Sequence, residues 1–349
     1  MGLIITDDII IVGTSFSQNG SGVPDMNSIF FKNISSRISV EKLDILKEAT
    51  HKFPRMNGTL SRNLYLLGIK KKLMGKNIHV MHTIDLFNTM PLLDLSRYSR
   101  KKIITVHDFY PFYRKPDETF TFRFADFLKR RCYDYLESYD HIFVRNNEIS
   151  RTLISEYEID RNAISIQGPI IGYEYSPTKM HKDGDKVIIG YINNFNWNKA
   201  PMLKYFINTF KTIRSNELEL HIYGSGFPFQ ELIREDSRIK YFGFLEDHKV
   251  PQTLGSFNAY LSTSTIEGFS IPIAKAKAME IPILSYDGNL PEITKRNTFL
   301  WNEHILREII RGRLWEKVDT YKAYLDVANL RPERVAEQTI EVYTQVFGQ

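Results

Sequence analysis

The stretch AYLSTSTIEGFSIPIAKAKA, residues 259–278, decides the fold. It opens with a short apolar run typical of a buried strand in a parallel sheet. A polar turn containing Gly268 follows, and Pro272 suits the start of a helix, where its missing N–H costs nothing. Strand, turn and helix in this order predict one unit of a doubly wound sheet, in which ligands bind at the carboxyl ends of the strands.

The predicted helix start is a candidate anion site. Its first turn would present unpaired backbone N–H groups around Ser270 and Ile271, together with the positive end of the helix dipole. A diphosphate is an anion that such a helix start binds well. Glu267 lies at the rim, where a carboxylate can accept hydrogen bonds from sugar hydroxyls. Considered without relatives, ordinary helix capping explains the same turn.

Similar units recur on both sides of this stretch. Short apolar runs, each followed by a helical pattern, form two series: residues 9–12, 78–81, 103–106 and 142–144, then 187–191, 218–223, 239–242, 259–262 and 281–285. A polar segment with Pro and Gly, residues 175–186, separates the series. We therefore predict two α/β domains, at residues 1–175 and 176–331, and a terminal amphipathic helix at 332–349.

Composition agrees with this organisation. The 349 residues exceed the size at which a single core usually stops growing. The only cysteine, Cys132, excludes an intramolecular disulfide and fits a reducing compartment. Because no apolar run is long enough to span a membrane and no basic flank precedes the N-terminal isoleucines, a cytoplasmic location is expected.

Residues 49–84 carry seven lysines and arginines and no acidic residue. Such a positive field suits an anionic membrane surface, an anionic acceptor or nucleic acid, whereas a solvated lysine-rich face explains it equally well. Since no nucleic-acid-binding motif accompanies the segment, nucleic acid is not an expected partner. Peripheral contact with an anionic membrane is the functional hypothesis for this segment.

The stretch at residues 264–272 resembles the signature Ser-x-x-Glu-Gly-Phe-Gly-x-Pro of the retaining glycosyltransferases of family 4. Further pieces similar to that family follow its order along most of the chain: TVHD at 105–108, GYINNFNWNK at 190–199, HIYGSG at 221–226, NLPEI at 289–293 and RVAE at 334–337. The family has the GT-B fold, with two Rossmann-like domains facing a central cleft and a C-terminal helix that crosses back to the N-terminal domain. The resemblance implies this fold here.

The resemblance also implies roles for individual residues. Glu267 and His107 would be the catalytic residues, with His107 reaching the donor sugar near the reacting carbon. Lys199 would bind the donor phosphates, and Gly224 would lie near the nucleotide base. The helix start under the diphosphate would contribute Gly268, Phe269, Ser270 and Ile271.

Three features complete or depart from the family pattern. The loop Gly20, Ser21 and Gly22 occupies the position of a glycine-rich loop near the acceptor and the diphosphate, although an ordinary surface loop explains it as well. Lys275 replaces a glutamate that binds the nucleotide ribose. An arginine usually found after the glycine at position 190 is missing. We expect Lys275 to donate to phosphate or ribose oxygens of the donor and so replace part of the missing charge.

The implied reaction is the metal-independent transfer of a hexose from a nucleoside diphosphate sugar, with retention, to the hydroxyl of a glycan, lipid-linked or protein acceptor. No cofactor besides the donor substrate is expected. Asp183 and Asp185 imitate a metal-binding pair but follow no strand, so no metal site is expected. Two alternatives stay open: a catalytically silent sugar-nucleotide or glycan-binding protein, which Lys275 favours, and a nucleotide-sugar epimerase of the same fold.

Overall fold

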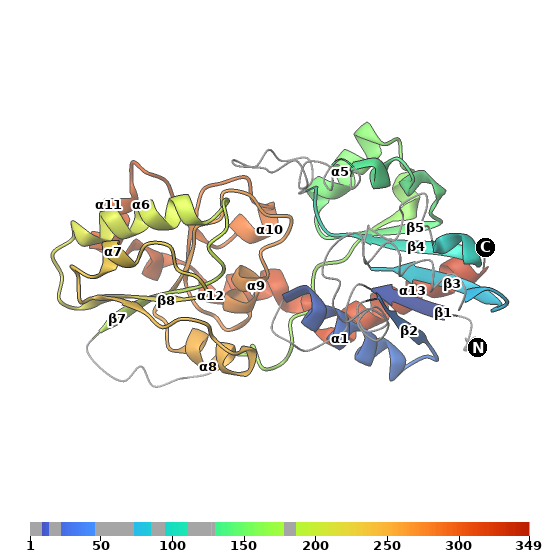
Figure 1. Ribbon diagram of the computed structural model, residues 1–349, viewed down its shortest axis with the longest axis horizontal. Helices are drawn as coiled ribbons and strands as arrows, with labels where there is room; N and C mark the ends of the chain where they lie inside the picture. The colour runs from blue at the N-terminus through green and yellow to red at the C-terminus, as the bar shows by residue number, and fades with distance from the viewer. Residues whose placement is uncertain are drawn as a thin grey trace. The chain divides into compact units, whose positions relative to one another are not determined.

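The computed structural model describes residues 9–13, 22–45, 73–84, 95–109, 127, 130–177 and 186–348. It divides the chain into two compact units (Figure 1). Unit 1 comprises Met1–Ile170 together with Pro332–Gln349, and unit 2 comprises Ile171–Arg331. The sequence placed the first boundary at residue 175, five residues later. Residues 171–175 belong with unit 2 because Ile171 and Tyr175 are buried in its core.

Unit 1 is built on a six-stranded parallel sheet of order β2-β1-β3-β4-β5-β6. The strands are β1 (Ile9–Gly13), β2 (Glu41–Asp44), β3 (Ile78–Thr83), β4 (Ser99–Val106), β5 (His141–Val144) and β6 (Ile164–Ile166). The helices described in it include α1 (Gly22–Ser35), α5 (Asn147–Glu156) and α13 (Pro332–Gly348), with 3₁₀ turns at Ser96–Tyr98, Leu136–Ser138 and Arg161–Ala163. This arrangement confirms the predicted Rossmann-like domain.

The terminal helix α13 belongs to unit 1, as predicted, and runs beside α1 (Figure 1). Its apolar side, which includes Val335 and Val346, is buried against β1 and β3. The hydroxyl of Tyr343 lies 2.7 Å from Nδ1 of His82, a fully buried residue of β3. Burial lowers the pKa of His82 to about 3, so this histidine is neutral in the core. Helix α13 therefore completes the core that β1 and β3 form earlier in the chain.

Unit 2 repeats the design with a second six-stranded parallel sheet, of order β12-β11-β10-β7-β8-β9. The strands are β7 (Val187–Ile192), β8 (Leu218–Tyr223), β9 (Ile239–Tyr241), β10 (Ala259–Ser262), β11 (Ile283–Tyr286) and β12 (Phe299–Trp301). The helices are α6 (Ala200–Lys211), α7 (Gln230–Ile233), α8 (Val250–Gly255), α9 (Ile271–Ala278), α10 (Glu292–Lys295), α11 (Leu306–Gly312) and α12 (Thr320–Val327). Short 3₁₀ turns occur at Asp247–Lys249, Leu314–Lys317 and Ala328–Leu330.

Helices cover both faces of this second sheet. Along β7, Ile189 and Tyr191 point to the face covered by α6 and α11, whereas Ile188 and Ile192 point to the face covered by α8, α9 and α12. The strand is apolar on both sides, as strands buried between two helical layers are. Unit 2 is therefore doubly wound, which confirms the second predicted Rossmann-like domain.

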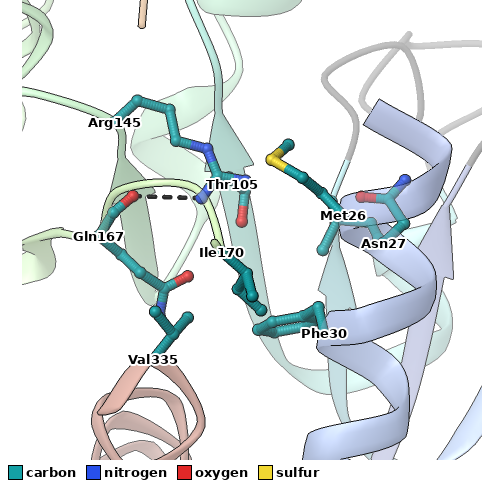
Figure 2. Close-up of a pocket in the computed structure, with 9 residues that line it drawn as sticks. Met26, Asn27, Phe30, Thr105, Arg145, Gln167, Ile170 and Val335 are labelled. Atoms are coloured by element: carbon teal, nitrogen blue, oxygen red, sulfur yellow. Dashed lines mark hydrogen bonds between the residues drawn. The ribbon is translucent and has the colours of Figure 1, made fainter. Parts of the chain in front are cut away.

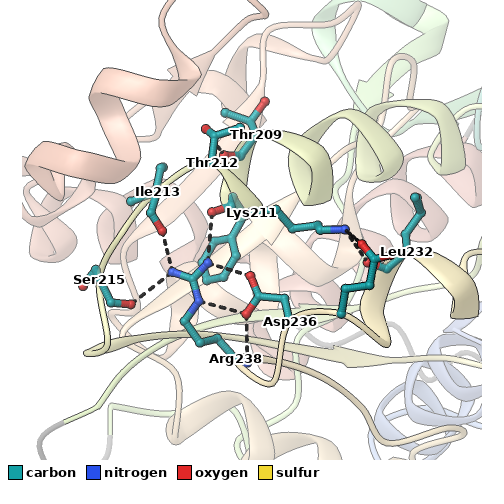
Figure 3. Close-up of polar contacts among 10 residues, drawn as sticks. Thr209, Lys211, Thr212, Ile213, Ser215, Leu232, Asp236 and Arg238 are labelled. Atoms are coloured by element: carbon teal, nitrogen blue, oxygen red, sulfur yellow. Dashed lines mark hydrogen bonds and ion pairs between the residues drawn. The ribbon is translucent and has the colours of Figure 1, made fainter.

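One arginine ties the end of α6 to the turn before β9 (Figure 3). Arg238 binds both oxygens of Asp236, at 2.9 and 2.6 Å, and donates to the backbone carbonyls of Ile213 and Ser215 at 2.6 and 3.0 Å. Its guanidinium also lies over the ring of Phe210, 4.9 Å from the centroid. Carbonyls at and beyond the end of a helix lack intrahelical partners, so the guanidinium of Arg238 provides the hydrogen-bond donors for the carbonyls that follow α6.

We expect Arg238→Met to destabilise unit 2 by about 2 kcal/mol, because charged hydrogen bonds in a partly buried site are lost. Urea denaturation followed by tryptophan fluorescence measures the change as a lower midpoint at an unchanged slope. Arg234→Met is the matched control, since its ion pair with Glu231 is exposed (68% and 82%) and should contribute little. Equal midpoints for the two variants would contradict the role assigned to Arg238.

Candidate functional site

Two turns at the carboxyl edge of the second sheet are joined by hydrogen bonds. One follows β7 and leads into α6; the other follows β10 and leads into α9. The N–H of Thr265 donates to the carbonyl of Asn198 at 2.8 Å, and the Asn198 side chain donates to the carbonyl of Ile266 at 2.9 Å. The hydroxyl of Thr263 donates to the carbonyl of Lys199 at 3.0 Å. Because β7 and β10 are neighbours in the sheet, these bonds fix the two turns as one surface.

The joined turns bring Lys199 and Glu267 together. Nζ of Lys199 lies 2.8 Å from Oε1 of Glu267, and both side chains are largely buried, with 9% and 17% of their surface exposed. The hydroxyl of Ser264 donates to the same carboxylate oxygen at 2.8 Å. Glu267 and Lys199 thus form a single ion pair. The sequence assigns Glu267 to the sugar and Lys199 to the phosphates of the donor.

The start of α9 adjoins this pair. Ser270 is the N-cap residue and is buried, yet its side chain accepts no hydrogen bond from the first turn of the helix. The helix begins at Ile271, so that Pro272 occupies the second helical position, one later than the sequence suggested. Backbone N–H groups of a first turn without a side-chain cap are available to an anion. Phe269 and Ile271 pack against the apolar core below the turn.

Two glycines allow neighbouring turns to approach this surface closely. At Gly288, which follows β11, an added Cβ would lie 2.5 Å from the carbonyl oxygen of Thr265. At Gly224, which follows β8, it would lie 2.1 Å from the carbonyl oxygen of Asn193, and the backbone φ of +146° also favours glycine. Four consecutive strands of the sheet, from β11 to β8, therefore contribute turns to one edge.

Lys275 lies on α9 but is directed at an aromatic ring. Its Nζ sits 4.5 Å from the centroid of the Tyr175 ring, within the range of a cation–π interaction. Tyr175 is itself buried. The expected contact between Lys275 and the donor remains a prediction. In this structure the ammonium group is held by the segment that enters unit 2.

Lys277, two residues after Lys275 on the same helix, has a structural role that the sequence did not suggest. It is fully buried and donates to Asp326 at 2.9 Å and to the carbonyls of Ile293 and Arg296 at 2.8 and 2.6 Å. Burial lowers its pKa, while the carboxylate of Asp326 acts in the opposite direction. These bonds connect α9 to α10 and α12 and so support the helix whose start forms the candidate site.

His107, the second predicted catalytic residue, lies in unit 1 directly after β4. Its Nε2 is 2.9 Å from the carbonyl oxygen of Ile84, and its Nδ1 is 3.2 Å from Nε of Arg145. A carbonyl only accepts and a guanidinium only donates, so Nε2 carries the proton and Nδ1 accepts. Burial and the charge of Arg145 lower the pKa of His107 to about 3. Both ring nitrogens of this neutral histidine are therefore engaged.

Arg145 was not anticipated from the sequence. It follows β5, and its Nη1 donates to the carbonyl of Gln167 at 3.1 Å (Figure 2) and to that of Gly168 at 3.0 Å. Burial lowers its pKa to about 10. A cavity of about 10 Å³, enough for a single water, lies beside it and is lined also by Thr105 and Met26. In the described part of the chain, Arg145 has no carboxylate partner, and its charge acts on His107 instead.

Other predicted features fall wholly or partly beyond the described residues. Gly20 and Ser21 lie outside them, and Gly22 is the first residue of α1. Of the basic segment 49–84, only residues 73–84 are described, and Lys76 there pairs with Glu41 at 2.7 Å. Asp183 and Asp185 also lie outside. Within the described residues, no three potential metal-ligating side chains come together. No described helix is both long and apolar enough to cross a bilayer.

Replacing Arg145 tests what keeps His107 neutral. We expect Arg145→Gln to raise the pKa of His107 while burial still holds it below 6.5, which a titration of the imidazole NMR signals measures. The folded state favours the neutral ring of His107, whereas the unfolded state does not. The free energy of unfolding therefore declines as the pH falls below about 6.5, where the ring becomes protonated in the unfolded chain. Arg151→Gln, at an exposed position on α5, serves as control. An unchanged titration in Arg145→Gln would rule out this effect.

A comparison with models of known protein families finds a match within the second unit. Residues 186–311 match the family model described as "Glycosyl transferases group 1". This range contains β7, the joined turns, Lys199, Glu267 and α9. No curated protein matches the chain.

Solved structures share the fold over nearly the whole chain. A glycosyltransferase from Rickettsia africae has 15% identity and a TM-score of 0.71, covering 98% of this chain and 99% of its own. Sucrose-phosphate synthase from Thermosynechococcus elongatus has 12% identity and a TM-score of 0.72, with 98% and 99% covered. Anabaena HepE, in complex with UDP-glucose, has 12% identity and a TM-score of 0.68, with 97% and 99% covered. The chain thus has the GT-B fold of these glycosyltransferase structures and carries a glycosyl transferases group 1 match in its second unit.

Proposed function

We propose that this protein is a glycosyltransferase that transfers a sugar from a nucleoside diphosphate sugar to an acceptor hydroxyl. The observation that carries the proposal is the ion pair between Lys199 and Glu267 at the uncapped start of α9. It lies at the carboxyl edge of a doubly wound sheet, where such folds bind their ligands. The family match over residues 186–311 supports the same assignment.

The chemistry of the site suits a diphosphate leaving group. Departure of the diphosphate places negative charge on its oxygens, and fixed donors at that position lower the barrier. Lys199 and the first N–H groups of α9 would supply those donors without moving, because Asn198, Thr263 and Thr265 hold their turns together. Lys199 has three N–H donors and would serve the phosphates while still paired with Glu267.

Glu267 would face the sugar. A carboxylate beside the departing diphosphate accepts hydrogen bonds from sugar hydroxyls and stabilises the positive charge that develops on the sugar ring. Ser264 and Lys199 both bind its Oε1 and so fix its orientation. Without them, a glutamate on a turn would lose rotamer freedom on binding and would position the sugar less well.

The finer features of the reaction are part of this proposal. HepE was solved with UDP-glucose and with UDP and glucose, and another structure of this fold is a lipopolysaccharide outer core galactosyltransferase with 16% identity. These two proteins support a hexose donor and a glycan or lipid-linked acceptor. Retention and independence from metal rest on the resemblance of residues 264–272 to the family signature. His107 would contact the sugar through its backbone, because Ile84 and Arg145 already engage both nitrogens of its ring.

Lys199→Ala should weaken binding of nucleoside diphosphates by about 10- to 100-fold, the equivalent of one charged hydrogen bond. Binding of the corresponding nucleosides should change little, because they lack the phosphates. Calorimetric titration with UDP, GDP and ADP, and with uridine, guanosine and adenosine, measures both effects. Lys204→Ala changes an exposed lysine on the same helix and is the matched control. If Lys199→Ala bound the preferred diphosphate like the wild type, Lys199 would have no phosphate contact.

Glu267→Gln should lower the turnover number by about 100-fold or more, because the amide keeps the size of the side chain but loses its charge. Release of nucleotide from labelled nucleotide sugars measures turnover, and the exposed Glu308→Gln provides the control. Near-normal turnover in Glu267→Gln would refute its catalytic role. In the same assay an epimerase would alter the sugar without releasing nucleotide, and a binding protein would do neither.

A further inference from the structure

The opposite edge of the second sheet carries a polar depression far from the turns described above. It lies where α6 and α11 end and β8 begins, at the amino ends of the strands. The depression has a volume of about 630 Å³ and is lined by four arginines, Arg214, Arg307, Arg311 and Arg313, with Glu217 and Ser215 among the other lining residues. Pockets for small molecules commonly measure about 300 to 1,000 Å³, so the depression is large enough for one.

The arginines outnumber their possible partners. Arg313 forms an ion pair with Glu217, the only acidic residue of the lining. In the part of the chain that the structure describes, the side chains of Arg214, Arg307 and Arg311 form no hydrogen bond and no ion pair. Three exposed guanidinium groups without a partner therefore share one depression, a concentration of positive charge that attracts an anion.

Helix architecture explains only part of this clustering. Arg311 lies in the last turn of α11, where a cation interacts favourably with the negative end of the helix dipole. Arg307 lies one turn earlier on the same side of the helix, where an i,i+4 neighbour of like charge is unfavourable. Arg214 comes from a different element, the loop between α6 and β8. The convergence of separate elements is what a ligand site requires.

Arg313 adds a strained backbone to the same rim. Its φ of 48° and ψ of 41° place it in the left-handed region, which favours glycine, at the residue that ends α11. The preceding residue, Gly312, is a glycine, but the left-handed conformation is adopted by Arg313. An arginine at this position directs its side chain to Glu217 and keeps a fourth guanidinium at the depression.

From this arrangement we infer that the depression is a second anion site, which binds a phosphate-rich ligand through Arg214, Arg307 and Arg311. Guanidinium groups bind phosphate oxygens in pairs of parallel hydrogen bonds, and three of them match a ligand with several phosphates or a phosphorylated headgroup. The site is separate from Lys199 and Glu267 and does not depend on the proposed reaction. A soluble oligophosphate and an anionic lipid headgroup offer the same chemistry.

The test uses the full chain and two probes, tripolyphosphate in solution and vesicles of phosphatidylcholine with phosphatidylglycerol. The site variant is Arg214→Gln/Arg307→Gln/Arg311→Gln. Its control, Lys204→Gln/Arg234→Gln/Lys322→Gln, removes the same charge from other places in unit 2. Lys199→Ala serves as a second control, because tripolyphosphate is also expected to bind at the start of α9.

We expect the site variant to lose at least about 10-fold in affinity for one of the probes, whereas the charge control stays within about 2-fold of the wild type. Binding of tripolyphosphate at this site should persist in Lys199→Ala, and the site variant should keep its affinity for nucleoside diphosphate. Loss confined to tripolyphosphate identifies a soluble ligand, and loss confined to vesicle sedimentation identifies a lipid headgroup. Equal losses in the site variant and the charge control, or no binding of either probe by the wild type, would overturn the inference.

Discussion

The close approach of β10 to β7 at Gly190 is the constraint on which the second unit depends. A Cβ at this position would lie 2.0 Å from the ring of Phe257, so only glycine lets Phe257, in the segment that leads into β10, pack against β7. The pairing of Tyr260 with Gly190 then sets the register of the two central strands. Because the register is fixed, the turn after β7 and the turn after β10 leave the sheet side by side. The ion pair of Lys199 and Glu267 follows from that geometry.

The two units handle buried charge in different ways. In unit 2, the buried cations Lys199 and Lys277 each face a carboxylate, so each charge is neutralised within a few ångströms. In unit 1, Arg145 faces carbonyl oxygens and the neutral ring of His107. A positive charge compensated only by dipoles attracts an anion more strongly than a paired one does. At the carboxyl edge of the first sheet, Arg145 therefore keeps a positive charge that no described carboxylate pairs, whereas the second sheet has an ion pair beside a helix start.

Much of the fold could be predicted from the sequence because each of the longer apolar runs is typical of a buried strand in a parallel sheet. All nine predicted runs form strands. The strands that were missed, β2, β6 and β12, have only three or four residues and partly exposed side chains, and β12 is apolar but too short to stand out as a strand. The glycines at 190 and 224 and the turn at 264–272 were recognisable by pattern. The roles of Asn198, Arg145 and Gly288 were not, because each depends on contacts with turns distant in the sequence.

The hydrogen bond from the N–H of Ile171 to the carbonyl of Leu330 has a consequence for the order of folding. The chain enters unit 2 and leaves it at adjacent points, and Arg331 strengthens the junction by donating to the carbonyl of Gly172 at 2.9 Å. Unit 2 is thus a continuous insertion within unit 1. During synthesis, all of unit 2 emerges before α13, whose side chains cover Ile9, Ile11 and Val80. Unit 1, whose strands β1 to β6 precede unit 2 in the chain, therefore completes its core only when α13 is made, and until then part of one apolar face of its sheet is uncovered.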